Sequence, residues 1–125
     1  MKLFDLSLST PYLSLDPIFY HEVSTTPLRN PRLVSVNAEA AKMLGLDPEK
    51  LSARELEELL NGTRLLPGSR PYAMCYAGHQ FGYYVPRLGD GRAINLGVVG
   101  GWNLQLKGSG QTLYSRQGDG RAVLR

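Results

Sequence analysis

The spacing of apolar residues changes after Pro67-Gly68, and this change restricts the fold more than any other feature of the sequence. In 53–60 the leucines recur at intervals of three and four, which is typical of a helix with one apolar face. In 93–107 apolar and polar residues alternate, which is typical of strands that bury one face. The sequence therefore predicts an α+β fold in which short helices precede antiparallel strands.

Capping residues locate two short helices ahead of the strands. Asn37 is a good N-cap, and Gly45 can end the helix that Asn37 begins. Ser52 followed by Glu55 forms a capping box for a second helix, which we expect to end at Asn61-Gly62. The first 35 residues contain four prolines and are expected to form an extended arm that packs on the domain, with no regular element of its own.

The alternation in 93–107 predicts a β-hairpin with the three-residue loop Val99-Gly100-Gly101. This loop pairs Val98 with Trp102 and separates an apolar face from a polar one. A two-residue loop, Gly100-Gly101, would mix apolar and charged residues on one face. The predicted polar face consists of Ala93, Asn95, Gly97, Asn103, Gln105 and Lys107.

The length and the cysteine content exclude several classes of protein. A chain of 125 residues can form one domain with a modest core but is short for a two-lobed enzyme. No apolar run approaches the roughly 20 residues of a membrane span, and residues 1–16 lack the apolar stretch of a secretory signal. The single cysteine, Cys75, excludes an intramolecular disulfide and fits a reducing compartment. We therefore expect a cytoplasmic protein, or a mitochondrial one if a targeting segment is missing, and not a secreted one.

Positive charge and glycine are concentrated in the same part of the chain. Residues 81–125 hold six Lys/Arg against two Asp/Glu, and ten of the fourteen glycines, whereas residues 1–80 hold eight Lys/Arg against nine Asp/Glu. Basic side chains beside exposed backbone amides are typical of phosphate sites. The alternatives are a set of glycine-rich turns with solvated arginines, and a basic nucleic-acid-binding module, although no RNA-binding signature accompanies the charge.

The pentapeptide GDGRA occurs twice, at 89–93 and at 118–122. In the first copy, Gly89 and Gly91 can adopt positive φ and bring backbone amides close to a ligand, and Arg92 can bind phosphate. No P-loop or dinucleotide fingerprint is present. The remaining order of glycine loop, strand, turn and strand with an inward Lys107 is that of the N-terminal lobe of protein kinases. The residues alone thus favour phosphate or nucleotide binding.

Four segments carry a more specific resemblance. They are YAGHQFG (76–82), PRLGDGRA (86–93), LQLKGSGQT (104–112) and YSRQGDGRAVLR (114–125). Together they resemble the SelO/YdiU family, the selenoprotein O pseudokinases. The resemblance implies a kinase-like protein adenylyltransferase that transfers AMP from ATP to Ser, Thr or Tyr hydroxyls of proteins, with some members using UTP. It also implies Mg²⁺ or Mn²⁺, and an N-terminal arm with short helices (1–69) followed by part of a kinase-like N-lobe (70–125).

The resemblance implies specific roles for residues of both repeats. The family's ATP contacts fall on Gly89, Gly91, Arg92, Lys107, Asp119 and Gly120. The catalytic Asp and the metal ligands of the family lie beyond this sequence, so the chain is expected to be an N-terminal piece that is inactive alone. A non-catalytic nucleotide-binding or degenerate fragment remains the first alternative.

Overall fold

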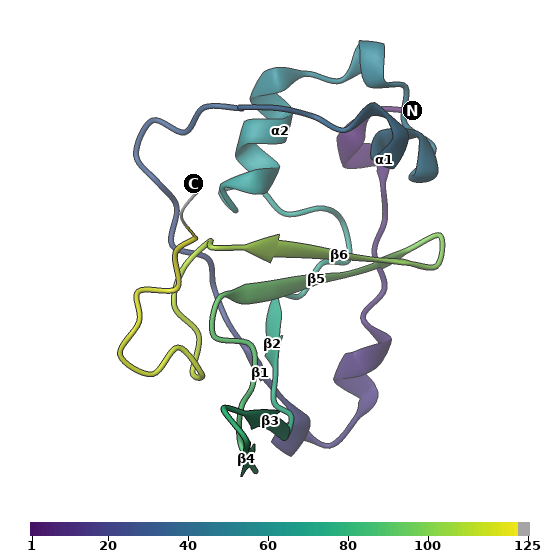
Figure 1. The fold of residues 1–125 in the computed structure, drawn as a ribbon. Coiled ribbons are helices and arrows are strands. Elements are labelled where there is room, and N and C mark those ends of the chain that lie inside the picture. Colours follow the sequence, from purple (N-terminus) through teal and green to yellow (C-terminus); the bar gives the residue numbers. More distant parts are fainter. Residues whose placement is uncertain (123–125) are drawn as a thin grey trace.

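A four-stranded antiparallel sheet organises the part of the chain that the computed structural model describes, residues 1–122 (Figure 1). Its strand order is β1-β2-β5-β6, and a separate two-stranded ribbon, β3-β4, projects from the body. The strands are β1 (Tyr20–Glu22), β2 (Tyr72–Met74), β3 (Gly78–Gln80), β4 (Tyr83–Val85), β5 (Ala93–Val99) and β6 (Trp102–Lys107). The helices are α1 (Ala38–Met43), α2 (Ala53–Leu60) and the 3-10 turns η1 (Leu3–Asp5), η2 (Pro11–Ser14), η3 (Pro17–Phe19) and η4 (Pro48–Lys50). Mixed helix and antiparallel sheet confirm the α+β class.

Both predicted helix caps are confirmed. The Asn37 side chain accepts a hydrogen bond from the Ala40 amide at 3.1 Å, and the Ser52 hydroxyl accepts one from the Glu55 amide at 3.2 Å. Beyond α1, Gly45 has φ +80°. The ends of the two helices therefore follow from local sequence.

The prediction that the first 35 residues contain no regular element is wrong. Pro11 and Pro17 open 3-10 turns, and β1 pairs with β2 through the register Tyr20↔Met74 to Glu22↔Tyr72. The ring of Tyr12 stacks on that of Tyr72, with centroids 5.5 Å apart. A three-residue strand is too short for a period of two to be visible in the sequence, which is why the arm seemed irregular.

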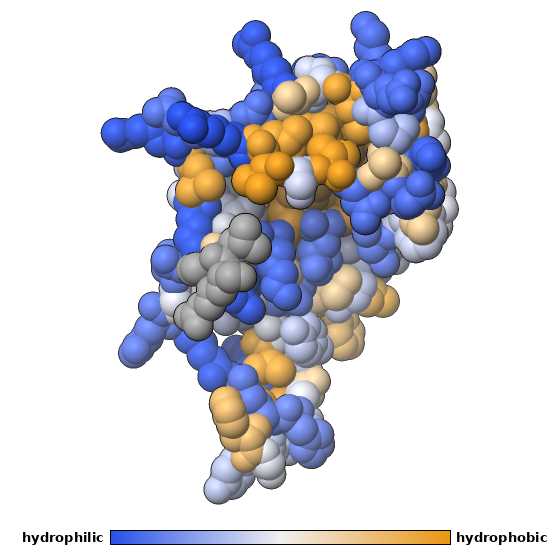
Figure 2. All heavy atoms as spheres, turned by 45° about the horizontal axis from the view of Figure 1, so that its top comes forward, coloured by the Kyte–Doolittle hydropathy of each residue, from blue (hydrophilic) through white to orange (hydrophobic). Residues whose placement is uncertain are grey.

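The hydrophobic core joins the arm, the helices and the sheet. Its buried members are Leu3, Leu6, Leu8, Ala41, Leu46, Leu59, Leu66, Leu96 and Leu106. Residues on both sides of the predicted boundary after residue 69 thus share one core. An apolar patch over the helical end of the molecule remains open to solvent (Figure 2), and Val36, Leu44, Leu56 and Leu60 contribute to the groove there. No helix within residues 1–122 is long and apolar enough to cross a membrane.

The predicted three-residue hairpin loop is wrong near the turn and right farther from it. β5 and β6 are joined by Gly100-Gly101, whose φ values of +54° and +80° suit a tight two-residue turn, and Val99 pairs with Trp102. A bulge between Asn95 and Gly97 then shifts the register by one residue. Beyond the bulge the predicted pairs Ala93↔Lys107 and Asn95↔Gln105 are present, so this part of the polar face is confirmed.

Next to the bulge, the arm pairs with β5 through an isolated antiparallel bridge between Ser9 and Val98. Ser9 and Val98 exchange two backbone hydrogen bonds, of 2.9 and 2.7 Å. Gly97 has φ +140°, and a Cβ there would lie 2.7 Å from the Ser9 carbonyl oxygen. Only glycine fits so close to the crossing backbone.

Candidate functional site

A polar groove of about 250 Å³ lies where the first glycine loop meets the start of β5 and the end of β6. It is lined by Tyr76, Asp90, Gly91, Arg92, Ala93, Gln105 and Lys107. Three of the six residues expected to bind ATP, Gly91, Arg92 and Lys107, therefore line one cavity.

Backbone pairing places the two basic residues beside each other. Lys107 lies opposite Ala93 in the sheet, and the Gly108 amide donates to the Arg92 carbonyl oxygen at 2.8 Å. Both side chains are exposed, and no carboxylate of residues 1–122 lies within 4.0 Å of either cationic group. The groove therefore presents two cations that an anionic ligand could pair with.

Asp90 lines the groove and is held by hydrogen bonds from two strands. Its Oδ2 accepts hydrogen bonds from the Met74 amide at 2.9 Å and from Asn95 Nδ2 at 3.0 Å. The Asn95 side chain is buried, also donates from Nδ2 to the Tyr72 carbonyl oxygen at 3.2 Å, and accepts at Oδ1 from Gln105 Nε2 at 3.0 Å. One chain of hydrogen bonds thus links three strands beneath the groove.

Tyr76 closes one side of the groove. Partial burial raises the pKa of its phenol above the ordinary value, and the nearby Asp90 carboxylate raises it further because the phenolate would be repelled. A side-chain hydrogen bond to the same carboxylate also raises the pKa, so the protonated Tyr76 hydroxyl is directed toward Asp90.

The segment 112–115 clamps the first glycine loop. The Thr112 hydroxyl donates to the Asp90 carbonyl oxygen, and the Ser115 hydroxyl donates to the Gly91 carbonyl oxygen at 2.6 Å.

The ring of Tyr114 lies against Gly89, which has φ +75°, and a Cβ on Gly89 would overlap that ring. Gly91 does not use the positive φ that is open to glycine, and a Cβ there would meet the Tyr114 carbonyl oxygen at 3.0 Å. Close packing against 114 accounts for both glycines within this structure.

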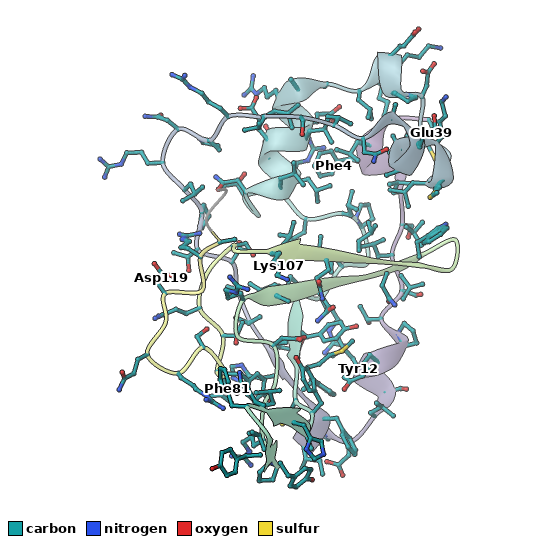
Figure 3. The ribbon with its side chains drawn as sticks, viewed as in Figure 1. Phe4, Tyr12, Glu39, Phe81, Lys107 and Asp119 are labelled. Atoms are coloured by element: carbon teal, nitrogen blue, oxygen red, sulfur yellow. The ribbon has the colours of Figure 1, made fainter. Side chains whose placement is uncertain are left out.

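The second GDGRA copy does not line the groove. Figure 3 shows Asp119 on the C-terminal loop, whereas Lys107 belongs to β6. The Asp119 carboxylate accepts from the Arg121 amide at 2.9 Å, and the Gly120 carbonyl oxygen accepts from the Gly110 amide at 3.4 Å. Arg121 donates to the Gly108 carbonyl oxygen at 3.4 Å, so this copy supports the loop that follows Lys107. ATP contacts from Asp119 and Gly120 stay a prediction.

The described residues do not fit a divalent cation. Asp90 is the one carboxylate lining the groove in residues 1–122, and its Oδ2 already accepts two N–H donors. No group of three His, Cys, Asp or Glu in that part of the chain could hold a metal ion. Mg²⁺ requires several oxygen ligands in near-octahedral geometry, and a single carboxylate does not supply them.

Sequence reasoning missed Asp90, Asn95, Gln105 and Tyr76 as parts of one site. Asn95 and Gln105 share the predicted polar face of the hairpin, and this shared face is the one signal in the sequence for a side-chain pair. The sequence gives no such signal for Asp90, because its partners on β2 are distant in sequence.

Comparison with known proteins gives consistent matches over the whole chain. The family model described as "Protein adenylyltransferase SelO" matches residues 2–125. The protein nucleotidyltransferase YdiU of Bordetella avium (strain 197N) is 50% identical over 128 residues, covering 99% of this chain and 26% of that protein. The protein of the same name from Thiobacillus denitrificans is 51% identical over 125 residues, covering 96% of this chain and 26% of that protein. The chain thus spans about a quarter of the length of these curated relatives.

Proposed function

Because the chain belongs to the SelO family, we propose that it is the nucleotide-binding part of a protein adenylyltransferase, with ATP as the nucleotide. The observation that carries the proposal is the polar groove, which is lined by Arg92, directly before β5, and by Lys107, at the end of β6 opposite Ala93. Neither has a carboxylate partner within residues 1–122, and guanidinium and ammonium groups are the usual protein partners of phosphate oxygens.

In the whole protein, the proposed reaction is attack by a Ser, Thr or Tyr hydroxyl of a protein substrate on the α-phosphate of ATP. The new bond joins the hydroxyl oxygen to that phosphorus, the bond from the α-phosphorus to the bridging oxygen breaks, and pyrophosphate leaves. The hydroxyl proton would pass to a general base supplied by residues outside this chain. Arg92 and Lys107 would hold and neutralise phosphate oxygens. UTP is the alternative donor, and Mg²⁺ or Mn²⁺ would need ligands from outside residues 1–122.

ATP binding by the 125-residue chain tests the proposal. Isothermal titration calorimetry should show ATP binding that weakens at least about tenfold in Lys107→Ala, because one charge-assisted contact to phosphate is worth roughly 1.5–3 kcal/mol. Lys50→Ala is the control, since Lys50 is exposed on η4 and does not line the groove. Equal affinity in Lys107→Ala and the unaltered chain would contradict the proposed role of Lys107.

Two further assays separate the alternatives. With labelled ATP and an acceptor protein, we expect ATP binding without transfer by this chain, and robust labelling would contradict the assignment of catalysis to residues outside it. A basic nucleic-acid-binding module would instead show RNA affinity that falls steeply with salt, and ATP binding without such affinity argues against it.

A further inference from the structure

The hydrogen bonds beneath the groove run in one direction. Asp90 offers only acceptor atoms to Asn95, so the donor end of the Asn95 amide, Nδ2, must face Asp90. The same Nδ2 donates to the Tyr72 carbonyl oxygen, which is also an acceptor only. Both N–H groups of Nδ2 are thus assigned, and an inverted Asn95 amide would place its oxygen against two acceptors.

The fixed orientation of Asn95 determines that of Gln105. Asn95 Oδ1 faces Gln105 and can only accept, so Gln105 presents Nε2 to it, at 3.0 Å. The other end of the Gln105 amide is the acceptor Oε1, to which no group of residues 1–122 donates a hydrogen bond. Gln105 lines the groove together with Arg92 and Lys107.

We propose that Gln105 is a specificity-determining residue, whose Oε1 accepts a hydrogen bond from the nucleoside part of the ligand while Arg92 and Lys107 bind its phosphates. This inference rests on the proposed function and deepens it. The two cations recognise negative charge wherever it occurs, so they cannot distinguish a nucleotide from free polyphosphate. A fixed, neutral acceptor beside the two cations can make this distinction, because it binds a ligand more tightly when that ligand carries an O–H or N–H donor next to its phosphates.

The donor can come from a ribose hydroxyl or from the exocyclic amine of the base. Both groups are neutral, and both would be matched by an amide oxygen. Inorganic tripolyphosphate carries neither group and therefore reports on the cations alone.

The test compares ATP with inorganic tripolyphosphate on the 125-residue chain and on Gln105→Met. Methionine keeps the length of the side chain but has no strong acceptor. It also removes the Nε2 donor to the buried Asn95 Oδ1, and a thermal melt of Gln105→Met measures that cost separately from ligand affinity. We expect ATP to bind about five- to tenfold more weakly to Gln105→Met, the loss of one neutral hydrogen bond, and tripolyphosphate to bind unchanged. Asn103→Ala removes an exposed amide from the same strand, outside the groove, and should change neither.

Three analogues then identify the donor: 2′-deoxy-ATP, 3′-deoxy-ATP and the triphosphate of purine riboside, which lacks the 6-amino group. The analogue without the donor should bind equally to Gln105→Met and to the unaltered chain. Equal losses for ATP and tripolyphosphate in Gln105→Met, or no loss for either, would overturn the inference, as would a difference that persists with all three analogues. The proposed function fails separately, if the unaltered chain binds neither ATP nor tripolyphosphate.

Discussion

Asp90 shows how one side chain can serve both the fold and the groove. Its carboxylate holds the Met74 amide on β2 and the Asn95 side chain on β5, while its own amide donates to the Met74 carbonyl oxygen at 2.9 Å. The second repeat has an aspartate at the same place, Asp119, which is exposed and, among residues 1–122, accepts a hydrogen bond from the Arg121 amide alone. The two identical pentapeptides thus give their aspartates different hydrogen-bond partners. Asp90 binds groups on β2 and β5, whereas Asp119 binds an amide of its own loop.

This difference predicts that removing the Asp90 carboxylate lowers the free energy of unfolding more than removing the Asp119 carboxylate does. Asp90→Ala leaves two N–H donors without their acceptor in a partly buried place, and should lower the free energy of unfolding by about 3 kcal/mol. Asp119→Ala removes one exposed hydrogen bond and should cost less than about 1 kcal/mol. Urea denaturation followed by circular dichroism measures both, and equal losses would contradict the structural role of Asp90.

Substitutions at Gly82 and Gly89 distinguish the cost of backbone strain from the cost of side-chain overlap. Both have φ near +80°, but a Cβ on Gly82 would meet nothing within 4 Å, whereas one on Gly89 would overlap the Tyr114 ring. Gly82→Ala should therefore cost only the strain of a left-handed alanine, about 1 kcal/mol. Gly89→Ala should lower the free energy of unfolding clearly more than Gly82→Ala does. A thermal melt in which both variants unfold at the same temperature would contradict the packing of Tyr114 on this loop.

At the scale of elements, the parts that were predictable are those that depend on neighbours in sequence. The caps Asn37 and Ser52 act on amides three residues away, so their effect is visible in the sequence. The register of β5 and β6 was predictable only between Ala93 and Asn95. The bulge lies where Gly97 packs against Ser9 of the arm, and that contact joins segments distant in sequence. The pairing of β1 with β2 and the hydrogen bonds of Asp90 to β2 likewise join distant segments.

The cap of α2 gives a prediction at this scale. Ser52→Ala removes the hydrogen bond to the Glu55 amide and should destabilise the domain by about 1 kcal/mol, because α2 contributes Leu59 to the core. Ser52→Asp keeps an acceptor at the N-cap and should restore most of the loss. Chemical denaturation checks this series, and no recovery in Ser52→Asp would show that the loss has another origin.

At the scale of the whole molecule, tyrosines connect the arm to the sheet. Burial is the largest cause that raises the pKa values of Tyr12 and Tyr72, and the negative charge of Asp90 contributes to both. The folded state therefore holds these phenol protons more tightly than the unfolded chain does. The resulting stability is fully present below the ordinary tyrosine pKa of about 10 and is lost as pH rises above it.

The free energy of unfolding should accordingly fall as pH rises beyond about 10. Tyr12→Phe should reduce this slope, since it removes one of the shifted phenols while keeping the ring that stacks on Tyr72. Urea titrations at several pH values measure the slope, and an identical slope in Tyr12→Phe would contradict the contribution of this residue.

The pairing of β1 with β2 also sets an order of events during synthesis. Tyr20–Glu22 leaves the ribosome long before its partner Tyr72–Met74 exists, with both α-helices encoded between them. Contacts between segments so far apart close slowly, whereas the helices need only local contacts. The edge strand β1 therefore cannot pair until β2 has been synthesised. The sheet that carries the groove is completed only once β2, β5 and β6 have emerged.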